Sequence, residues 1–115
     1  MWTLEKLRKH TLFVTDVDIE KWGSEISIYC LILKTFPNQE ITYPLSIHLM
    51  DCSLITYQSL LDDDCDLGEA DVISFDISSS ENEKKNRIEI TADLFFLRVE
   101  YGNNVEIISE LDPGK

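Results

Sequence analysis

The chain has 115 residues, a length typical of one domain, and we expect residues 1–115 to form a single domain. Its composition is 43% hydrophobic with only four glycines and three prolines, which predicts a globular fold and argues against a disordered chain. The formal net charge is -12. This charge disfavours direct binding to nucleic acid, because a phosphate backbone requires a basic footprint.

The sequence predicts a cytoplasmic protein with no membrane segment. Met1–His10 alternates charged residues with leucine and lacks the apolar run of a secretory signal. The longest apolar candidate, Ile26–Leu33, is only strand-sized. Cys30, Cys52 and Cys65 are odd in number and far apart, which is typical of a reducing compartment.

The first half of the chain predicts a short helix followed by strands. Residues 1–10 place Leu4 and Leu7 among charged residues, as in a short amphipathic helix. The other predicted elements are a strand at 11–19, a turn at 21–24, and strands at 25–36 and 41–49 joined by a turn at Pro37. Because apolar residues occupy both parities of 25–36, we expect a central strand covered on both faces.

The second half predicts one more helix and several further strands. Residues 53–61 carry Leu54, Tyr57 and Leu60 at helical spacing, which indicates a short helix. The remaining predictions are an acidic loop at 62–71, strands at 73–77, 88–92 and 95–101 with a bulge or turn near Asp93, and a hairpin turn at 102–104 into a strand at 105–108. The fold class predicted is α+β: a mainly antiparallel β-sheet with one or two short helices.

The negative charge is concentrated in one stretch of the sequence. From Thr35 to Glu83 there are eleven acidic residues and no lysine or arginine, whereas the rest of the chain is nearly balanced. The density is highest in Asp62–Asp71. Such a tract is either a solvated surface that keeps the protein soluble or a surface that attracts a basic partner.

No motif predicts a metal site or a cofactor. Asp62, Asp64 and Asp66 match the opening of an EF-hand loop, but Leu67 replaces the turn glycine and Ile73 replaces the bidentate glutamate. His10 and His48 have no histidine or cysteine at metal-ligand spacing beside them, and His48 falls on the polar side of its strand.

No catalytic signature is present either. The four glycines are isolated, so there is no phosphate-binding loop, and no nucleophile elbow occurs. We therefore predict that the protein is not an enzyme but a binder of a basic protein. Tyr57, next to the acidic tract, is the aromatic residue expected to act as an interface anchor. The predicted partner-binding residues are Asp62, Asp63, Asp64, Asp66, Glu69, Asp71 and Tyr57.

In size, acidity, strand-rich pattern and lack of a catalytic signature, the chain resembles bacterial immunity proteins, the antidotes of contact-dependent and polymorphic toxin systems. The resemblance implies a one-to-one complex with a cognate toxin, often a basic nuclease, whose active site the acidic surface covers. Two alternatives remain open at the level of sequence: a DNA mimic that inhibits a DNA-binding protein, and a small non-enzymatic scaffold. The oligomeric state is not predicted.

Overall fold

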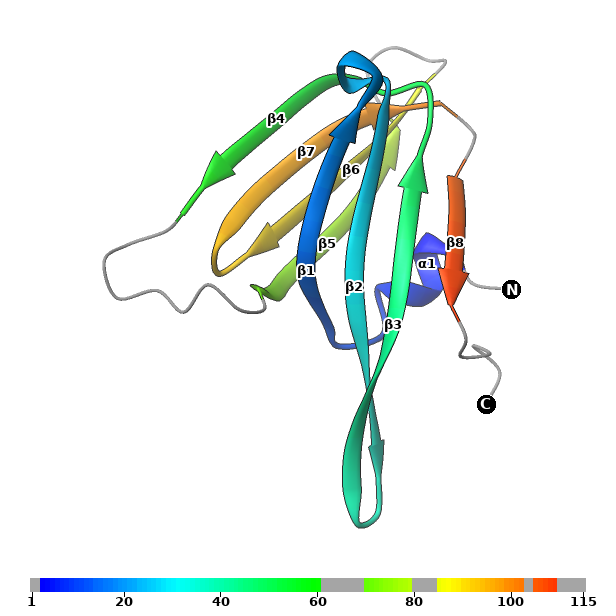
Figure 1. The fold of residues 1–115 in the computed structure, drawn as a ribbon, viewed down its shortest axis with the longest axis vertical. Helices are drawn as coiled ribbons and strands as arrows, with labels where there is room; N and C mark the ends of the chain where they lie inside the picture. The colour runs from blue at the N-terminus through cyan, green and yellow to red at the C-terminus, as the bar shows by residue number, and fades with distance from the viewer. Residues whose placement is uncertain (1–2, 61–69, 80–84, 103–104, 110–115) are drawn as a thin grey trace.

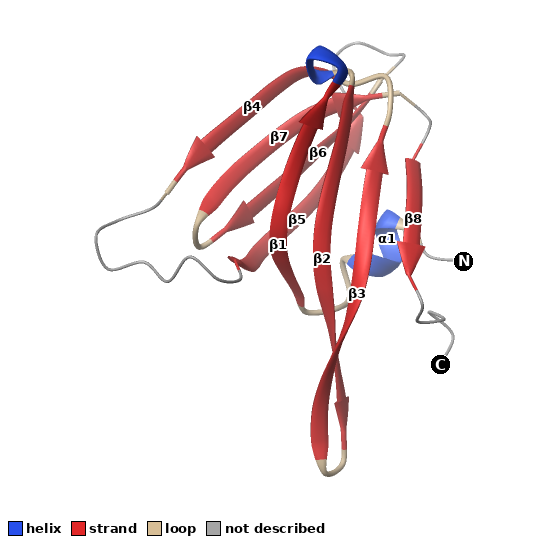
Figure 2. Cartoon of the chain, in the orientation of Figure 1, coloured by secondary structure: helices blue, strands red, loops and turns tan. Residues whose placement is uncertain are grey.

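The computed structural model describes residues 3–60, 70–79, 85–102 and 105–109, which form a fold dominated by β-strands (Figures 1 and 2). The elements of this described part are α1 (Leu4–Leu7), β1 (Leu12–Glu20), a 3-10 turn η1 (Lys21–Gly23), β2 (Glu25–Phe36), β3 (Gln39–Leu49), β4 (Ser53–Ser59), β5 (Ala70–Ser79), β6 (Asn86–Ala92), β7 (Phe95–Tyr101) and β8 (Val105–Ser109).

The strands form one antiparallel sheet that folds over into two layers. Their order is β4-β7-β6-β5-β1-β2-β3-β8. Among the described residues, β1 and β5 pair at Phe13 with Asp71 and at Val14 with Ala70, which is a short junction between the two layers. Figure 1 shows β1 and β2 crossing in front of β5, β6 and β7, with β3 and β8 continuing the front layer to the right. The facing sides of the two layers enclose the core.

The core is built from alternate residues of each strand. Ile28 of β2 and Ile47 of β3 lie directly opposite each other and are fully buried. Ile90 and Leu97 form the corresponding pair in the rear layer. The outward side chains of β2, such as Tyr29, are exposed or half-buried. The expectation that β2 is covered on both faces is therefore wrong, because the second layer covers only one of them.

A β-bulge at Thr15 reverses the faces of β1. Before the bulge, Leu12 and Val14 are buried, whereas after it Val17 is opposite the buried Ile28. The Thr15 hydroxyl donates a hydrogen bond of 3.1 Å to the carbonyl oxygen of Tyr29. One extra residue in a strand re-aims every later side chain. The alternation in the sequence did not reveal this bulge.

The helical content is smaller than the predicted fold class requires. α1 confirms the first short helix; the Thr3 hydroxyl accepts a hydrogen bond from the amide of Lys6, and Leu7 is fully buried. The described chain otherwise contains only the 3-10 turn, so mainly antiparallel β is the accurate description and α+β fits only loosely. No helix in the described ranges is long and apolar enough to cross a membrane.

The helix predicted at residues 53–61 is wrong: Ser53–Ser59 is strand β4, at the edge of the rear layer. In Figure 1, β4 extends beyond the front layer, and Leu54, Tyr57 and Leu60 are exposed. Their helical spacing does not mark a buried face. Pairing with β7 and the β-branched Ile55 and Thr56 favour a strand here.

β8 confirms the predicted last strand but not its expected pairing. Val105–Ser109 pairs with β3 in the front layer rather than with β7, so β7 and β8 do not form the predicted hairpin. Within the described residues, β8 pairs with β3 from Leu45 to Leu49, and Pro44 lies one position before this ladder.

Both described cysteines are free thiols held away from water. Cys30 is buried in the core, as predicted, and burial raises its pKa to about 12. Cys52 is half-buried, and burial raises its pKa to about 11. Thiols in this state are poor nucleophiles, because the thiolate is the reactive form. Cys65 lies outside the described residues.

Replacing Ile47 by alanine should lower the free energy of unfolding by about 2–5 kcal/mol, since it leaves a cavity at the centre of the front layer. Ile108→Ala, on the exposed side of β8 with 53% of the side chain accessible, should change it by less than about 0.5 kcal/mol. Urea denaturation of the two variants provides the measurement. Equal losses would contradict the assignment of faces.

In a Cys65→Ser background, the remaining two thiols should react slowly with a thiol reagent at pH 8. At a pKa of about 11, only about one Cys52 in a thousand is a thiolate at that pH. The rate at Cys52 should therefore rise about tenfold per pH unit as the pH increases toward 11. In denaturant both thiols should react rapidly, whereas fast reaction of the native protein at pH 8 would contradict the burial.

Candidate functional site

The two described ends of the acidic tract meet at the β6–β7 turn. The amide of Leu60 donates to the carbonyl oxygen of Leu94 at 2.9 Å. The amide of Asp71 donates to Oδ1 of Asp93 at 2.9 Å, and the amide of Asp93 donates back to the carbonyl oxygen of Asp71 at 3.0 Å. The tract therefore starts and finishes at one corner of the rear layer.

Of the predicted partner-binding residues, only Tyr57 and Asp71 lie within the described chain; Asp62, Asp63, Asp64, Asp66 and Glu69 lie outside it. Tyr57 stacks on Phe95 with ring centroids 5.8 Å apart and an interplanar angle of 15°. Its side chain remains 53% exposed, and Asp71 is exposed too. Phe95 follows the β6–β7 turn, so both described residues belong to this corner.

The other described acids of the 35–83 stretch are scattered. Glu40 lies opposite Thr35 near the tip of the β2–β3 hairpin, whereas Asp51 follows the far end of β3. Asp76 lies on β5 and contacts Arg8 of α1 at 3.9 Å. Closeness in the sequence therefore does not bring these carboxylates together, since each falls on a different part of the fold.

A different set of acids does gather on one surface, the outer side of the front layer. Strand register places Asp16, Tyr29 and Ser46 in one row across β1, β2 and β3, and Asp18, Ser27 and His48 in the next row. The neighbouring residues on β8 are Ile108 and Glu106, and the last cross-strand pair of β1 and β2 is Glu20 with Glu25. We call this surface the acidic face, with the acids Asp16, Asp18, Glu20, Glu25 and Glu106.

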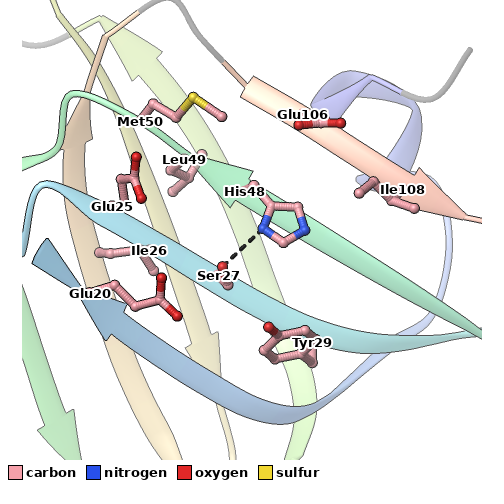
Figure 3. Close-up of a pocket in the computed structure, with 10 residues that line it drawn as sticks. All are labelled: Glu20, Glu25, Ile26, Ser27, Tyr29, His48, Leu49, Met50, Glu106 and Ile108. Atoms are coloured by element: carbon pink, nitrogen blue, oxygen red, sulfur yellow. Dashed lines mark hydrogen bonds between the residues drawn. The ribbon is translucent and has the colours of Figure 1, made fainter.

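The acidic face contains a hollow of about 330 Å³. Figure 3 shows the His48 ring within it, with Glu20 and Glu25 on one side and Glu106 on the other. Nδ1 of His48 lies 2.9 Å from the Ser27 hydroxyl, and Nε2 lies 3.0 Å from the Ser46 hydroxyl. These hydroxyls fix the ring, which also meets Tyr29 edge-on with centroids 6.4 Å apart.

The charge on this surface is not balanced within the described chain. Lys21 is the basic residue at its margin, and its ammonium lies 3.1 Å from the Glu25 carboxylate. Glu20 and Glu25 lie directly opposite each other, an arrangement of like charges that destabilises a sheet. The front layer folds in spite of these carboxylates rather than because of them.

The hollow contains a hydroxyl and an imidazole at the distance of a nucleophile and its base, Ser27 and His48. Acyl transfer would also need amide donors for an oxyanion. The backbone around Ser27 is instead paired on both sides, with Asp18 of β1 and with His48 of β3. Within the described ranges, no group of three or more histidine, cysteine or carboxylate side chains could hold a metal ion.

Comparisons with known proteins give no family for this chain: no protein-family model matches it, and no curated protein matches it significantly.

Sequence reasoning missed the acidic face because all its members lie outside the 35–83 stretch, in the part of the chain whose total charge is nearly balanced. The sequence does show the alternation of Asp16, Asp18 and Glu20, and it places His48 on the polar side of its strand. What the sequence does not give is the order β1-β2-β3-β8, which adds Glu25 and Glu106 to the same surface. The order follows from long-range pairing, which one sequence does not specify.

Glu20→Gln should raise the free energy of unfolding by about 0.2–1 kcal/mol, because it removes the repulsion from Glu25. The gain should shrink as salt is added and screens the two charges. Glu40→Gln is the control, since Glu40 is exposed and faces the uncharged Thr35. Thermal or urea denaturation at low and high salt measures both. A loss of stability in Glu20→Gln would show that Glu20 supports the fold.

Proposed function

We propose that this protein is a stoichiometric inhibitor that binds a basic protein partner, in the manner of an immunity protein that neutralises a toxin domain. The acidic face is its principal described binding surface. A basic nuclease is the partner class that suits this surface best, since a nuclease presents positive charge to its own substrate. The proposal places the complex in the cytoplasm and requires no cofactor.

The observation that carries the proposal is the convergence of five carboxylates from three strands on one face, with Lys21 as the one lysine at its margin among the described residues. Complementary fields accelerate association and reject partners of the wrong charge. The Glu20–Glu25 pair adds weight, because a like-charge pair that opposes folding is more readily explained by binding.

The arrangement of His48 supports a binding role over a catalytic one. Both of its ring nitrogens are engaged by serine hydroxyls, and the amides near Ser27 belong to the strand ladders. A rigid, half-buried ring framed by carboxylates and by Tyr29 offers a shaped polar surface. Such preorganised surfaces lose little conformational entropy on binding.

The acidic tract between Leu60 and Ala70 provides a second candidate contact. Its described ends are fixed at the β6–β7 turn beside Tyr57, whose exposed ring stacks on Phe95. We propose that this corner contributes to the same partner's recognition, with Asp71 and Tyr57 as its described members. Variants of the two acidic regions can be compared directly.

The first test is capture of the partner and reconstitution of the complex. Immobilised protein is exposed to a lysate of the producing cells at about 0.01 M ionic strength, where the Debye length is about 30 Å. Bound proteins are eluted with rising salt, identified, and purified for titration. We expect a one-to-one complex with a basic domain, an on-rate that falls steeply with salt, and loss of that domain's activity.

Three sets of charge-neutralising variants then locate the surface. The face set is Asp18→Asn, Glu20→Gln and Glu106→Gln; the tract set is Asp62→Asn, Asp63→Asn, Asp64→Asn and Asp66→Asn; and the control set is Glu5→Gln, Glu40→Gln and Asp76→Asn. We expect the face set to lower the on-rate by about tenfold or more and the control set by less than about twofold.

Equal effects of the face and control sets would contradict a binding role for the acidic face. An effect confined to the tract set would place the interface at the β6–β7 corner instead. The range of partners separates the proposal from DNA mimicry, because DNA would compete with either inhibitor for a basic nuclease. A mimic should also bind unrelated proteins that recognise duplex DNA, whereas an immunity protein should bind its one partner.

A further inference from the structure

Backbone strain in the described chain is concentrated at one end of the molecule. The non-glycine residues with positive φ are Lys21 (51°), Trp22 (61°), Asp51 (54°) and Leu54 (48°). They belong to two segments, the turn Lys21–Gly23 and the connection Asp51–Leu54, which we call the strained end. The segments are adjacent: the amide of Cys52 donates to the carbonyl oxygen of Ser24, the residue that follows the turn, at 2.9 Å.

Several specific contacts hold this strained backbone in place. The ammonium of Lys85 donates to the carbonyl oxygen of Asp51 at 2.8 Å and lies 3.2 Å from the hydroxyl of Ser53. The amide of Gly102 donates to the carbonyl oxygen of Met50 at 3.2 Å. Gly102 is buried so tightly that a Cβ there would lie 2.9 Å from Cβ of Asp51. Strain that surrounding contacts maintain is characteristic of functional sites.

The strained end presents large apolar side chains to solvent. Trp22 is fully exposed, and Leu54 is 73% exposed. Tryptophan is the residue most enriched among interface hot spots, and burying an exposed tryptophan releases a large apolar area. A left-handed conformation at Trp22 costs stability that a glycine would avoid. The fold therefore sustains an unfavourable backbone in order to present this ring.

Trp22 stands at the end of the acidic face. Glu20 and Glu25, the last cross-strand pair before the turn, flank it in sequence and line the hollow. The indole face attracts cations more strongly than any other aromatic side chain, and a carboxylate binds guanidinium through two parallel hydrogen bonds. An arginine can bind the indole and a carboxylate together, because its planar guanidinium stacks on the ring while its edge donates hydrogen bonds to the carboxylate.

We propose that Trp22, together with Glu20 and Glu25, forms the anchor that receives an arginine of the basic partner. This inference rests on the proposed function and specifies which chemistry of the partner is recognised. A second copy of the chain is a poor occupant, because each copy carries a formal charge of -12 and repels the other. Anionic lipid headgroups are disfavoured by the same repulsion.

The experiment uses two probes, capped octapeptides of alternating glycine with arginine or with lysine, and the full chain with Trp2→Phe so that Trp22 is its sole tryptophan. Binding is followed by tryptophan emission and by calorimetry at low ionic strength. We expect a saturable change of Trp22 emission, and about threefold or greater preference for the arginine peptide. The double variant Glu20→Gln, Glu25→Gln should bind both peptides more weakly.

Trp22→Gly and Phe36→Ala complete the design, with binding by all variants measured calorimetrically. Trp22→Gly should bind the two peptides equally, and its urea midpoint should rise because glycine accepts the positive φ. Phe36→Ala removes another exposed ring, at the remote β2–β3 hairpin, and should keep the preference for arginine. If Trp22→Gly is more stable than its parent, misfolding cannot explain its loss of preference for the arginine peptide.

The outcomes separate the anchor from the proposed function. If both peptides bind with equal affinity and the Trp22→Gly variant binds as well as its parent, the anchor is overturned while binding of basic partners by the acidic face stands. If neither peptide binds at low ionic strength, the anchor is overturned and the proposed function loses its support as well. A preference for arginine that persists in Trp22→Gly would also overturn the anchor.

Discussion

The bulge at Thr15 is the local feature on which the character of this molecule depends. Leu12 and Val14 point into the core before it, and the acids of β1 would point the same way if the alternation continued. The extra residue turns Val17 inward and Asp16 and the following acids outward. The hydrogen bond from the Thr15 hydroxyl to the Tyr29 carbonyl oxygen stabilises this switch. As a result, the strand register that turns the apolar residues into the core also places the acids on the outer surface.

Two unfavourable features of the fold lie next to each other. The carboxylates of Glu20 and Glu25 oppose one another across β1 and β2, and the turn that joins these strands holds Lys21 and Trp22 at positive φ. Neither feature helps the chain to fold, and glutamine or glycine would relieve them. Their position beside the hollow and the exposed indole makes a common functional origin the simplest explanation. Stability and binding are expected to oppose each other here.

Much of the fold could be predicted from local patterns. The alternation in 41–49, the turn at Pro37 and the change of parity near Asp93 each correspond to observed strands and turns. The errors arose where pairing partners decide the structure. Residues 53–59 join the sheet as an edge strand although their apolar spacing is helical, and 105–109 crosses to β3 instead of folding back on β7. In both segments the decisive factor was pairing with a strand distant in the sequence: it made 53–59 a strand and set the position of 105–109.

The sequence by itself determined that the chain is strongly acidic, rich in strands and without a recognisable catalytic motif, because composition and periodicity are local properties. It also indicated Tyr57 and Asp71, whose role in binding stays a prediction. Only the tertiary structure decided which charges share a surface. Asp16 and Glu106 are distant in the chain, yet strand order and register place them on one face, since side chains in a sheet have their neighbours across strands rather than along the sequence.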